Sequence, residues 1–248
     1  MKKYIVLFMA IVSAAAAVAQ SRGNGTETDV FQTRGGHKVY FYAIKHACLR
    51  IVVDSIEIEV DPVGKLGDRQ TDYASYPKAD YILVTHEHGD HFDPEAIRTL
   101  SDTRTRVVTN QRCADQLGYG EIMKNGDSKS LGKLLRLEAV PAYNTTAGRE
   151  NFHPQGRDNG FVLTIDGLRI YIAGDTEDIP EMKRLRGIDI AFLPCNQPYT
   201  MTPEQLVRAA RIIKPKVLFP YHYGQTDVSG IPLQLKPLGI DVRIRQLQ

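Results

Sequence analysis

One short segment of the chain is dense in side chains that bind metal ions. Three histidines and an aspartate fall within the run His86-Glu87-His88-Gly89-Asp90-His91, directly after a strand-like stretch. Alternate side chains of an extended backbone point to the same side, so His86 and His88 share one face. We expect Gly89 to permit the tight turn that brings Asp90 and His91 to the same pocket. Three imidazoles and a carboxylate suit a divalent ion such as Zn(II), and a polar surface loop is the alternative interpretation.

Three further residues of ligand type stand in loops next to expected strands. Asp175 follows an apolar run at 169–173, His222 follows another at 217–220, and His153 lies in a long polar loop. Loops at strand ends are where binding sites are often built. Taken alone, each of these residues would be a turn, surface or packing residue, so spacing does not make any of them a ligand.

The elements around these residues predict a mixed α/β fold. Strand-like runs rich in β-branched and aromatic residues occur at 39–44, 49–53, 56–60, 81–84, 106–109, 135–140, 161–165, 169–173, 190–193, 217–220 and 242–244. Helix-start signals, each a capping residue followed by proline and an acid, occur at Asp93-Pro94-Glu95 and Thr202-Pro203-Glu204. Strand meanders that give way to strands alternating with helices indicate two mixed sheets flanked by helices, a four-layer αββα sandwich.

The beginning of the chain is typical of an export signal. Two lysines precede an apolar stretch, residues 4–17, that is short for a membrane-spanning helix, and small residues offer a cleavage site just before Gln20. We therefore predict a signal peptide over residues 1–20 and an exported protein, periplasmic or secreted, without stable membrane anchoring. An uncleaved N-terminal anchor is the alternative.

The remainder, residues 21–248, is expected to form a single domain, because no linker or repeat divides it. Loss of Lys2 and Lys3 with the signal peptide lowers the basic count from 31 to 29, which equals the 29 acidic residues. A neutral chain without a basic cluster lacks the charge that nucleic-acid binding needs, so a small-molecule substrate is expected. The oligomeric state is left open.

Taken together, the candidate ligands resemble the metal-binding set of the metallo-β-lactamase superfamily. The set appears in order along nearly the whole chain as His86-x-His88-x-Asp90-His91, then His153, then Gly174-Asp175-Thr176, and finally His222. Local motifs are similar to the branch of ascorbate-6-phosphate lactonase-like proteins and N-acyl-phosphatidylethanolamine phospholipases D. These motifs are His46-Ala47, Asp61-Pro62, Asn159-Gly160-Phe161-Val162-Leu163 and Ile170-Tyr171-Ile172-Ala173-Gly174-Asp175-Thr176.

This resemblance implies a metallo-hydrolase with two metal ions. One ion would be held by His86, His88 and His153, the other by Asp90, His91 and His222, with Asp175 bridging them. The ions, Zn(II) with Mn(II) or Fe as alternatives, would activate a shared water for attack on a small ester, lactone or phosphodiester. Asp90 would accept or shuttle a proton, and the expected catalytic residues are Asp90 and His222. A non-catalytic metal-binding protein and a nuclease of the same superfamily are the alternatives.

Two departures from the family pattern bear on the substrate. Asp175 stands where true β-lactamases of this fold carry cysteine or serine, which disfavours penicillin hydrolysis. The run Cys195-Asn196-Gln197 stands where the lactonase branch usually shows glycines. Candidate pocket-lining residues lie beside the ligand segments and are Tyr143, Asn144, Asn196, Tyr199, Tyr221 and Tyr223.

The remaining histidines and the cysteines are expected to be structural. His37 and His46 lie next to strand-like runs away from the ligand segments. The cysteines Cys48, Cys113 and Cys195 show no C-x-x-C spacing and are interpreted as buried packing residues. A disulfide between two of them and a ligand role for Cys195 are the alternatives.

Overall fold

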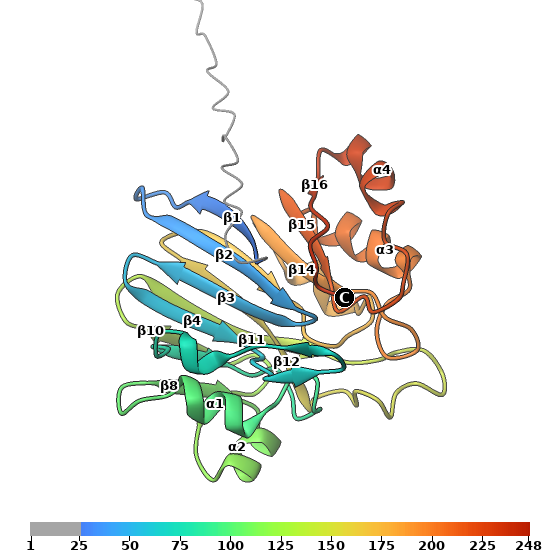
Figure 1. The fold of residues 1–248 in the computed structure, drawn as a ribbon. Coiled ribbons are helices and arrows are strands. Elements are labelled where there is room, and N and C mark those ends of the chain that lie inside the picture. Colours follow the sequence, from blue (N-terminus) through green and yellow to red (C-terminus); the bar gives the residue numbers. More distant parts are fainter. Residues whose placement is uncertain (1–25) are drawn as a thin grey trace, which may run out of the picture.

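The computed structural model describes residues 26–248, in which two β-sheets pack face to face (Figure 1). The predicted signal peptide, residues 1–20, lies outside the described residues. Within 26–248, no helix combines the length and apolar character needed to cross a membrane.

The first sheet is formed by the N-terminal half of the chain. Its strand order is β1 (Glu27–Gln32), β2 (Lys38–Lys45), β3 (Cys48–Val53), β4 (Ile56–Val60), β7 (Tyr81–Leu83), β8 (Arg106–Thr109) and β9 (Glu121–Ile122). Neighbouring strands are antiparallel from β1 to β4 and parallel from β4 onward. A separate two-stranded ribbon, β5 (Lys65–Leu66) and β6 (Arg69–Gln70), follows β4 in the chain.

The second sheet has the same plan. Its order is β10 (Ser128–Leu131), β11 (Leu135–Ala142), β12 (Asp158–Ile165), β13 (Leu168–Ile172), β14 (Ile190–Pro194), β15 (Val217–Tyr221) and β16 (Asp241–Val242). It also changes from antiparallel to parallel pairing at its fourth strand, β13. The fold thus repeats a topology that no sequence repeat reveals, and the ends of β4 and β13 hold equivalent places in the two sheets.

Three apolar clusters define four layers and confirm the predicted αββα sandwich. The central cluster lies between the sheets and includes Phe41 and Ile51 from the first sheet and Leu163 and Phe192 from the second. A second cluster joins the outer face of the first sheet to the elements η1 (Tyr73–Ser75), α1 (Pro94–Leu100) and α2 (Gln111–Leu117). The third joins the other outer face to η2 (Pro180–Arg184), α3 (Pro203–Ile213) and α4 (Ile231–Leu235), next to the short η3 (Lys236–Leu238).

Both predicted helix starts are confirmed. The Asp93 carboxylate caps α1 by accepting from the N–H of Glu95, and Thr202 forms a capping box with Gln205 at the start of α3. The apolar face of α3 is buried and includes Leu206, Val207, Ala210 and Ile213. The sequence did not predict β1, β5, β6, β9, β10, α2 or α4. These elements are short or, like β1, carry polar residues, and they depend on tertiary pairing more than on local pattern.

Candidate metal centre

The structure brings all seven predicted ligands to one site between the two sheets. The segment from His86 to His91 follows β7, Asp175 follows β13, and His222 follows β15. His153 comes from the loop between β11 and β12. Strands β13 and β15 both run parallel to β14, so their carboxyl ends lie at the same edge of the second sheet, and β7 of the first sheet brings the segment from His86 to His91 to that edge.

Three imidazoles make up the first triad, His86, His88 and His153. The Nδ1 atom of His88 lies 3.1 Å from Nε2 of His86 and 3.2 Å from Nε2 of His153. His86 and His153 are buried, whereas His88 is half-buried. The three nitrogen atoms therefore converge on one point and remain accessible from the His88 side.

A carboxylate and two imidazoles make up the second triad, Asp90, His91 and His222. The Oδ2 atom of Asp90 lies 3.2 Å from Nε2 of His222 and 3.9 Å from Nε2 of His91. Both histidines are buried, but the Asp90 side chain is 33% exposed. The second triad is thus open to solvent on the Asp90 side.

The Asp175 carboxylate lies between the two triads. Its Oδ2 atom is 3.4 Å from Nε2 of His153 in the first triad and 3.2 Å from Nε2 of His222 in the second. Its Oδ1 atom is 3.1 Å from Nε2 of His91. This is the place that a bridging ligand would occupy.

Two glycines explain how the chain presents Asp175. Gly174 has a φ of 65°, in the left-handed region that favours glycine, and a Cβ there would lie 2.8 Å from the Asn159 backbone oxygen. A Cβ on Gly160, across the sheet on β12, would lie 2.5 Å from the carbonyl oxygen of Ala173. Only glycines allow the strands to approach closely here, and this turn directs Asp175 into the site.

Gly89 does not have the role that the sequence predicted for it. Its φ is not in the left-handed region, and a Cβ at this position would meet no atom within 4 Å. The turn is instead held by the N–H of His91, which donates to the carbonyl of His88 at 2.9 Å. Glu87, between the ligands, points away from them and pairs with Arg112 at 2.8 Å. That ion pair ties the ligand segment to α2.

Hydrogen bonds on the far side of the rings fix the orientation of two histidines. The Asp61 carboxylate, at the end of β4, accepts from Nδ1 of His91 at 2.8 Å, and from the backbone N–H and the hydroxyl of Thr85 at 2.8 and 2.7 Å. The side-chain oxygen of Asn144 accepts from Nδ1 of His153 at 2.7 Å. Each bond turns Nε2 of its histidine toward the site, as is usual around metal-binding histidines.

We predict that Asp61→Asn weakens metal binding at the second triad by about 10- to 100-fold. An amide has one acceptor oxygen, whereas the Asp61 carboxylate uses both oxygens for its three donors. Zn(II) titration against a competing chelator measures the change. The matched control is Asp54→Asn. Asp54 pairs with His37 at the same distance of 2.8 Å, and His37 lies directly before β2. Equal Zn(II) affinity in Asp61→Asn and wild type would show that Asp61 does not orient a ligand.

The histidines divide into neutral and protonated groups. Burial lowers the pKa of His86 well below its ordinary value and lowers the pKa of His153 to about 4. Burial alone would also lower the pKa of His222, but the Asp175 carboxylate outweighs it and raises the value to about 9. The same competition, with Asp175 again the largest opposing charge, holds the pKa of His91 well above its ordinary value. In the metal-free protein at pH 7, His91 and His222 therefore carry protons.

Both carboxylates of the site are held ionised. Burial would raise the pKa of Asp175, but the charges on His222 and His91 hold it well below its ordinary value. Burial likewise opposes ionisation of Asp90, and His91 and His222 again lower its pKa. The protonated histidines occupy the place of positive charge that divalent ions would supply.

The residues present fit a divalent metal ion. Within residues 26–248, Nε2 of His91 and Oδ1 of Asp175 are buried without a hydrogen-bond partner, although the two atoms are 3.1 Å apart. Buried polar atoms are rarely left unpaired, so each of these atoms lacks a partner that an ion would provide. Imidazole nitrogens and carboxylate oxygens are the ligands that Zn(II), Mn(II) and Fe accept.

The interpretation of His46 as a structural residue remote from the ligands is wrong. Its Nε2 atom lies 3.2 Å from Oδ2 of Asp90, and its ring lies 3.8 Å from the ring of His222, measured between centroids. The β2–β3 turn reaches the site because the first sheet packs over the second, and no local sequence pattern shows that contact. His37, in contrast, pairs with Asp54 in a different region.

The hydroxyl groups of the predicted pocket tyrosines point to several places. The Tyr143 hydroxyl donates to Glu181 at 2.9 Å, and the Tyr223 hydroxyl donates to the carbonyl of Arg245 at 2.6 Å. Tyr221 is fully buried, whereas Tyr199 is 46% exposed and packs against Phe152, the neighbour of His153. Of these tyrosines, Tyr199 is the one that the structure leaves at the surface next to a ligand segment.

The two predicted pocket amides are placed differently. Asn144 is buried, and both ends of its side chain are used, since the oxygen accepts from His153 and the nitrogen donates to the carbonyl of Tyr199 at 2.8 Å. Asn196 is half-buried, and its side chain lies over Gly224, next to His222. Asn144 therefore acts on a candidate ligand, while Asn196 remains near the site with its amide in contact with the following turn.

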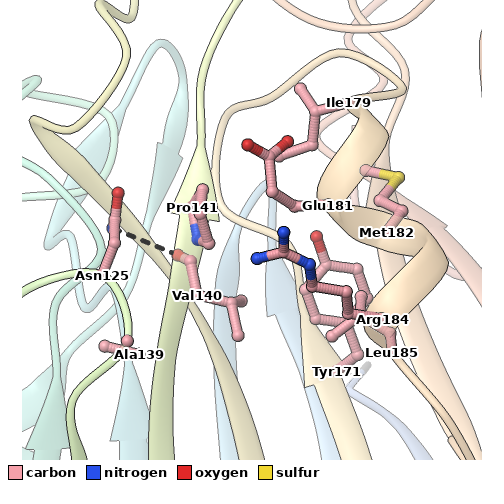
Figure 2. A pocket seen from close by; sticks show the side chains of 11 residues that line it. Asn125, Ala139, Val140, Pro141, Tyr171, Ile179, Glu181, Met182, Arg184 and Leu185 are labelled. Carbon is pink, nitrogen blue, oxygen red and sulfur yellow. Dashed lines mark hydrogen bonds between the residues drawn. The ribbon is translucent and has the colours of Figure 1, made fainter.

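A separate cavity of about 270 Å³ lies on the outer face of the second sheet (Figure 2). Apolar side chains such as Tyr171, Met182 and Leu185 line it, with Glu181 and Arg184 beside them (Figure 2). None of the seven candidate ligands lines this cavity. The Tyr143 hydroxyl, bonded to Glu181, belongs to this region.

All three cysteines are buried free thiols, so no disulfide joins them in the described part of the chain. Cys195 packs in the outer apolar cluster of the second sheet, and burial raises its pKa to about 12. We therefore predict that Cys195→Ser leaves the metal content unchanged, because a protonated thiol in an apolar cluster is not a ligand. Elemental analysis checks this, and loss of one metal equivalent would make Cys195 a ligand.

Comparisons with known proteins agree with this fold. A family model described as a β-lactamase superfamily domain matches residues 40–222. A UPF0173 metal-dependent hydrolase of Caldivirga maquilingensis is 31% identical over 189 residues, which cover 75% of this chain and 82% of the relative.

Two solved structures extend the likeness. A protein of Parabacteroides distasonis assigned as a metal-dependent hydrolase is 52% identical, with a TM-score of 0.87 over 90% of this chain and 100% of that one. Igni18, a metallo hydrolase from Ignicoccus hospitalis, is 24% identical, with a TM-score of 0.71 over 84% of this chain and 95% of that one. The second likeness bears on the fold alone.

A four-layer αββα sandwich with a histidine–aspartate cluster where its two sheets meet defines the metallo-β-lactamase fold. The chain belongs to the β-lactamase superfamily domain family, and within it to the metal-dependent hydrolases. The particular branch, with the lactonase-like proteins and phospholipases D, stays a prediction.

Proposed function

We propose that this protein is a hydrolase with two metal ions that acts on a small ester, lactone or phosphodiester. The observation that carries the proposal is the position of Asp175, whose Oδ2 atom lies within 3.4 Å of a ring nitrogen of each triad. Seven ligands are more than one tetrahedral ion can use, and a shared carboxylate leaves open positions for water and substrate.

The residues of the site would divide the work as follows. The first triad and the second triad would each hold one divalent ion, with Asp175 between them. When bound, the two ions would lower the pKa of a shared water toward neutrality and polarise the carbonyl or phosphoryl oxygen of the substrate. Zn(II) suits the donor set best, with Mn(II) or Fe as alternatives.

Asp90 is the best-placed proton acceptor in the site. Its carboxylate is held ionised by His91 and His222, and its side chain is 33% exposed on the open side. Its exposure on the open side would let it relay the proton of the attacking water to solvent or to the leaving group. His222 would hold the same ion as that carboxylate, since its Nε2 atom is 3.2 Å from Oδ2 of Asp90.

The open side also bears on the substrate. His88, Asp90 and the exposed Tyr199 are the parts of the site that solvent reaches. A small molecule that presents one carbonyl or phosphoryl group fits such an opening, and the formally neutral mature chain gives no attraction for a nucleic-acid backbone. An exported location, periplasmic or secreted, and a small-molecule substrate remain part of this proposal.

The test is hydrolysis by purified residues 21–248 of three generic substrates: an aryl phosphodiester, a simple lactone and an aryl ester. We expect turnover of at least one, lost on treatment with a chelator and restored by added Zn(II) or Mn(II). His88→Ala, which removes one ligand at the open edge, should abolish the restored activity. Chelator-resistant turnover would contradict the proposal. Absence of all turnover by a fully metal-loaded protein would favour the non-catalytic metal-binding alternative.

A further inference from the structure

His46 occupies an unusual place in the fold. It lies in the turn between β2 and β3, with a φ of 48°, in the left-handed region that few residues other than glycine adopt. Its side chain is only 9% exposed and enters the space between the two sheets. A residue held in a costly conformation and directed into a site is a candidate for a functional role.

Three contacts join His46 to the second triad. Its Nε2 atom lies 3.2 Å from Oδ2 of Asp90. Its ring lies against the ring of His222, with centroids 3.8 Å apart. Its backbone carbonyl accepts from the N–H of His222 at 3.2 Å. One residue of the first sheet thus contacts a ligand that follows β7 and another that follows β15 in the second sheet.

We propose that His46 is a positioning residue for the second metal position. Its Nε2–H donates to the Asp90 carboxylate, while its ring and carbonyl hold His222, so that the metal-binding atoms of both residues face the same point. This inference rests on the proposed two-metal function and adds a residue to it. His46 is not itself needed as a ligand, because the second triad and Asp175 already supply four donors.

The geometry also explains why this support is needed. The Asp90 side chain is 33% exposed, whereas His91 and His222 of the same triad are buried, and within residues 26–248 its Oδ2 atom has His46 and His222 as its hydrogen-bond partners. When a metal ion binds Nε2 of His222, that nitrogen no longer has a proton to donate to Asp90. His46 then remains as the donor that fixes the carboxylate.

Two variants separate the side-chain contact from the backbone conformation. His46→Asn keeps a residue that tolerates left-handed φ, but its side chain is too short to reach Asp90. His46→Gln keeps the reach and an N–H donor. The control is His37→Ala, at the other end of β2, which removes a surface histidine paired with Asp54.

The readouts are the stoichiometry and affinity of Zn(II), from titration against a chelator, and the visible absorption of the Co(II)-loaded protein, which reports the ligands of each ion. We expect His46→Asn to bind the second equivalent about 10- to 100-fold more weakly while the first is unchanged. His46→Gln should recover most of that loss, and His37→Ala should match wild type. Circular dichroism checks that each variant is folded.

The outcomes separate this inference from the function on which it rests. A wild-type protein that saturates at one equivalent would overturn the two-metal proposal and the role of His46 with it. Two equivalents in wild type with unchanged second affinity in His46→Asn would overturn the inference alone. Equal losses of second-equivalent affinity in His46→Asn and His46→Gln, with a changed Co(II) spectrum of the second ion, would show that His46 is a ligand. That result would also overturn the inference that His46 is a positioning residue.

Discussion

Replacement of Asp175 by alanine is expected to abolish tight binding at one metal position and to weaken it at the other. The carboxylate lies between the triads, with Oδ2 3.4 Å from His153 Nε2 and 3.2 Å from His222 Nε2. Its loss therefore removes a donor from both positions and the link that keeps two ions close enough to share a water. Hydrolysis should fall by more than the roughly 10- to 100-fold that loss of an outer hydrogen-bond partner costs.

The fold should survive this substitution. The three apolar clusters do not include Asp175, and without it His91 and His222 can lose their protons instead of remaining as unpaired buried charges. Circular dichroism together with elemental analysis separates loss of metal from loss of structure. Asp175→Asn, which keeps the volume of the side chain, should show the same loss of metal.

The matched control is Asp178→Ala, three residues further along the chain. Asp178 pairs with Arg208 of α3 at 2.8 Å on the protein surface, so its removal should cost at most about 1 kcal/mol of stability and no metal. If Asp175→Ala keeps both metal ions and near-normal turnover, Asp175 is only a turn residue. The site would then consist of the six other ligands.

Metal loading is expected to release about two protons per protein molecule at pH 7. His222, with a pKa of about 9, and His91, with a pKa well above its ordinary value, hold protons in the metal-free protein. Both nitrogens must be free of protons to bind metal, and a metal-bound water that ionises would add a third proton. His86 and His153 have lowered pKa values and contribute no proton near neutrality.

The sign of the pH dependence follows from these values. Because protons compete with metal for His91 and His222, two-metal binding should weaken as the pH falls from 8 to 6, by about tenfold per pH unit for each proton that the metal displaces. Calorimetry of Zn(II) binding in buffers of different ionisation enthalpy counts the protons. Release of less than one proton at pH 7 would show that these histidines are not both ligands.

The sequence was most informative where chemistry is contiguous. Three histidines and an aspartate at the end of one strand predict a metal site without further context, and the structure gathers them as expected. Asp175 and His222 were different, because each stands alone in the sequence and only the resemblance to a known family linked them. Their convergence arises from β13 and β15 ending at the same edge of one sheet.

The sequence could not predict contacts created by packing of one sheet over the other. His46 is 44 residues before Asp90 in the chain and far from His222, and nothing in its local sequence indicates that its turn would meet both. Asp61 belongs to the Asp61-Pro62 motif, but its hydrogen bonds to His91 and Thr85 form only when β4 and β7 are paired. Residues that orient ligands are thus harder to predict than the ligands themselves.

The metal content of purified residues 21–248 tests the central claim most directly. Residues 21–248 would be saturated with Zn(II) or, in a parallel sample, Mn(II), freed of excess metal, and analysed for metal and protein in the same solution. Two triads joined by Asp175 predict close to two equivalents per chain. Saturation at a single equivalent with either metal would contradict the two-metal centre.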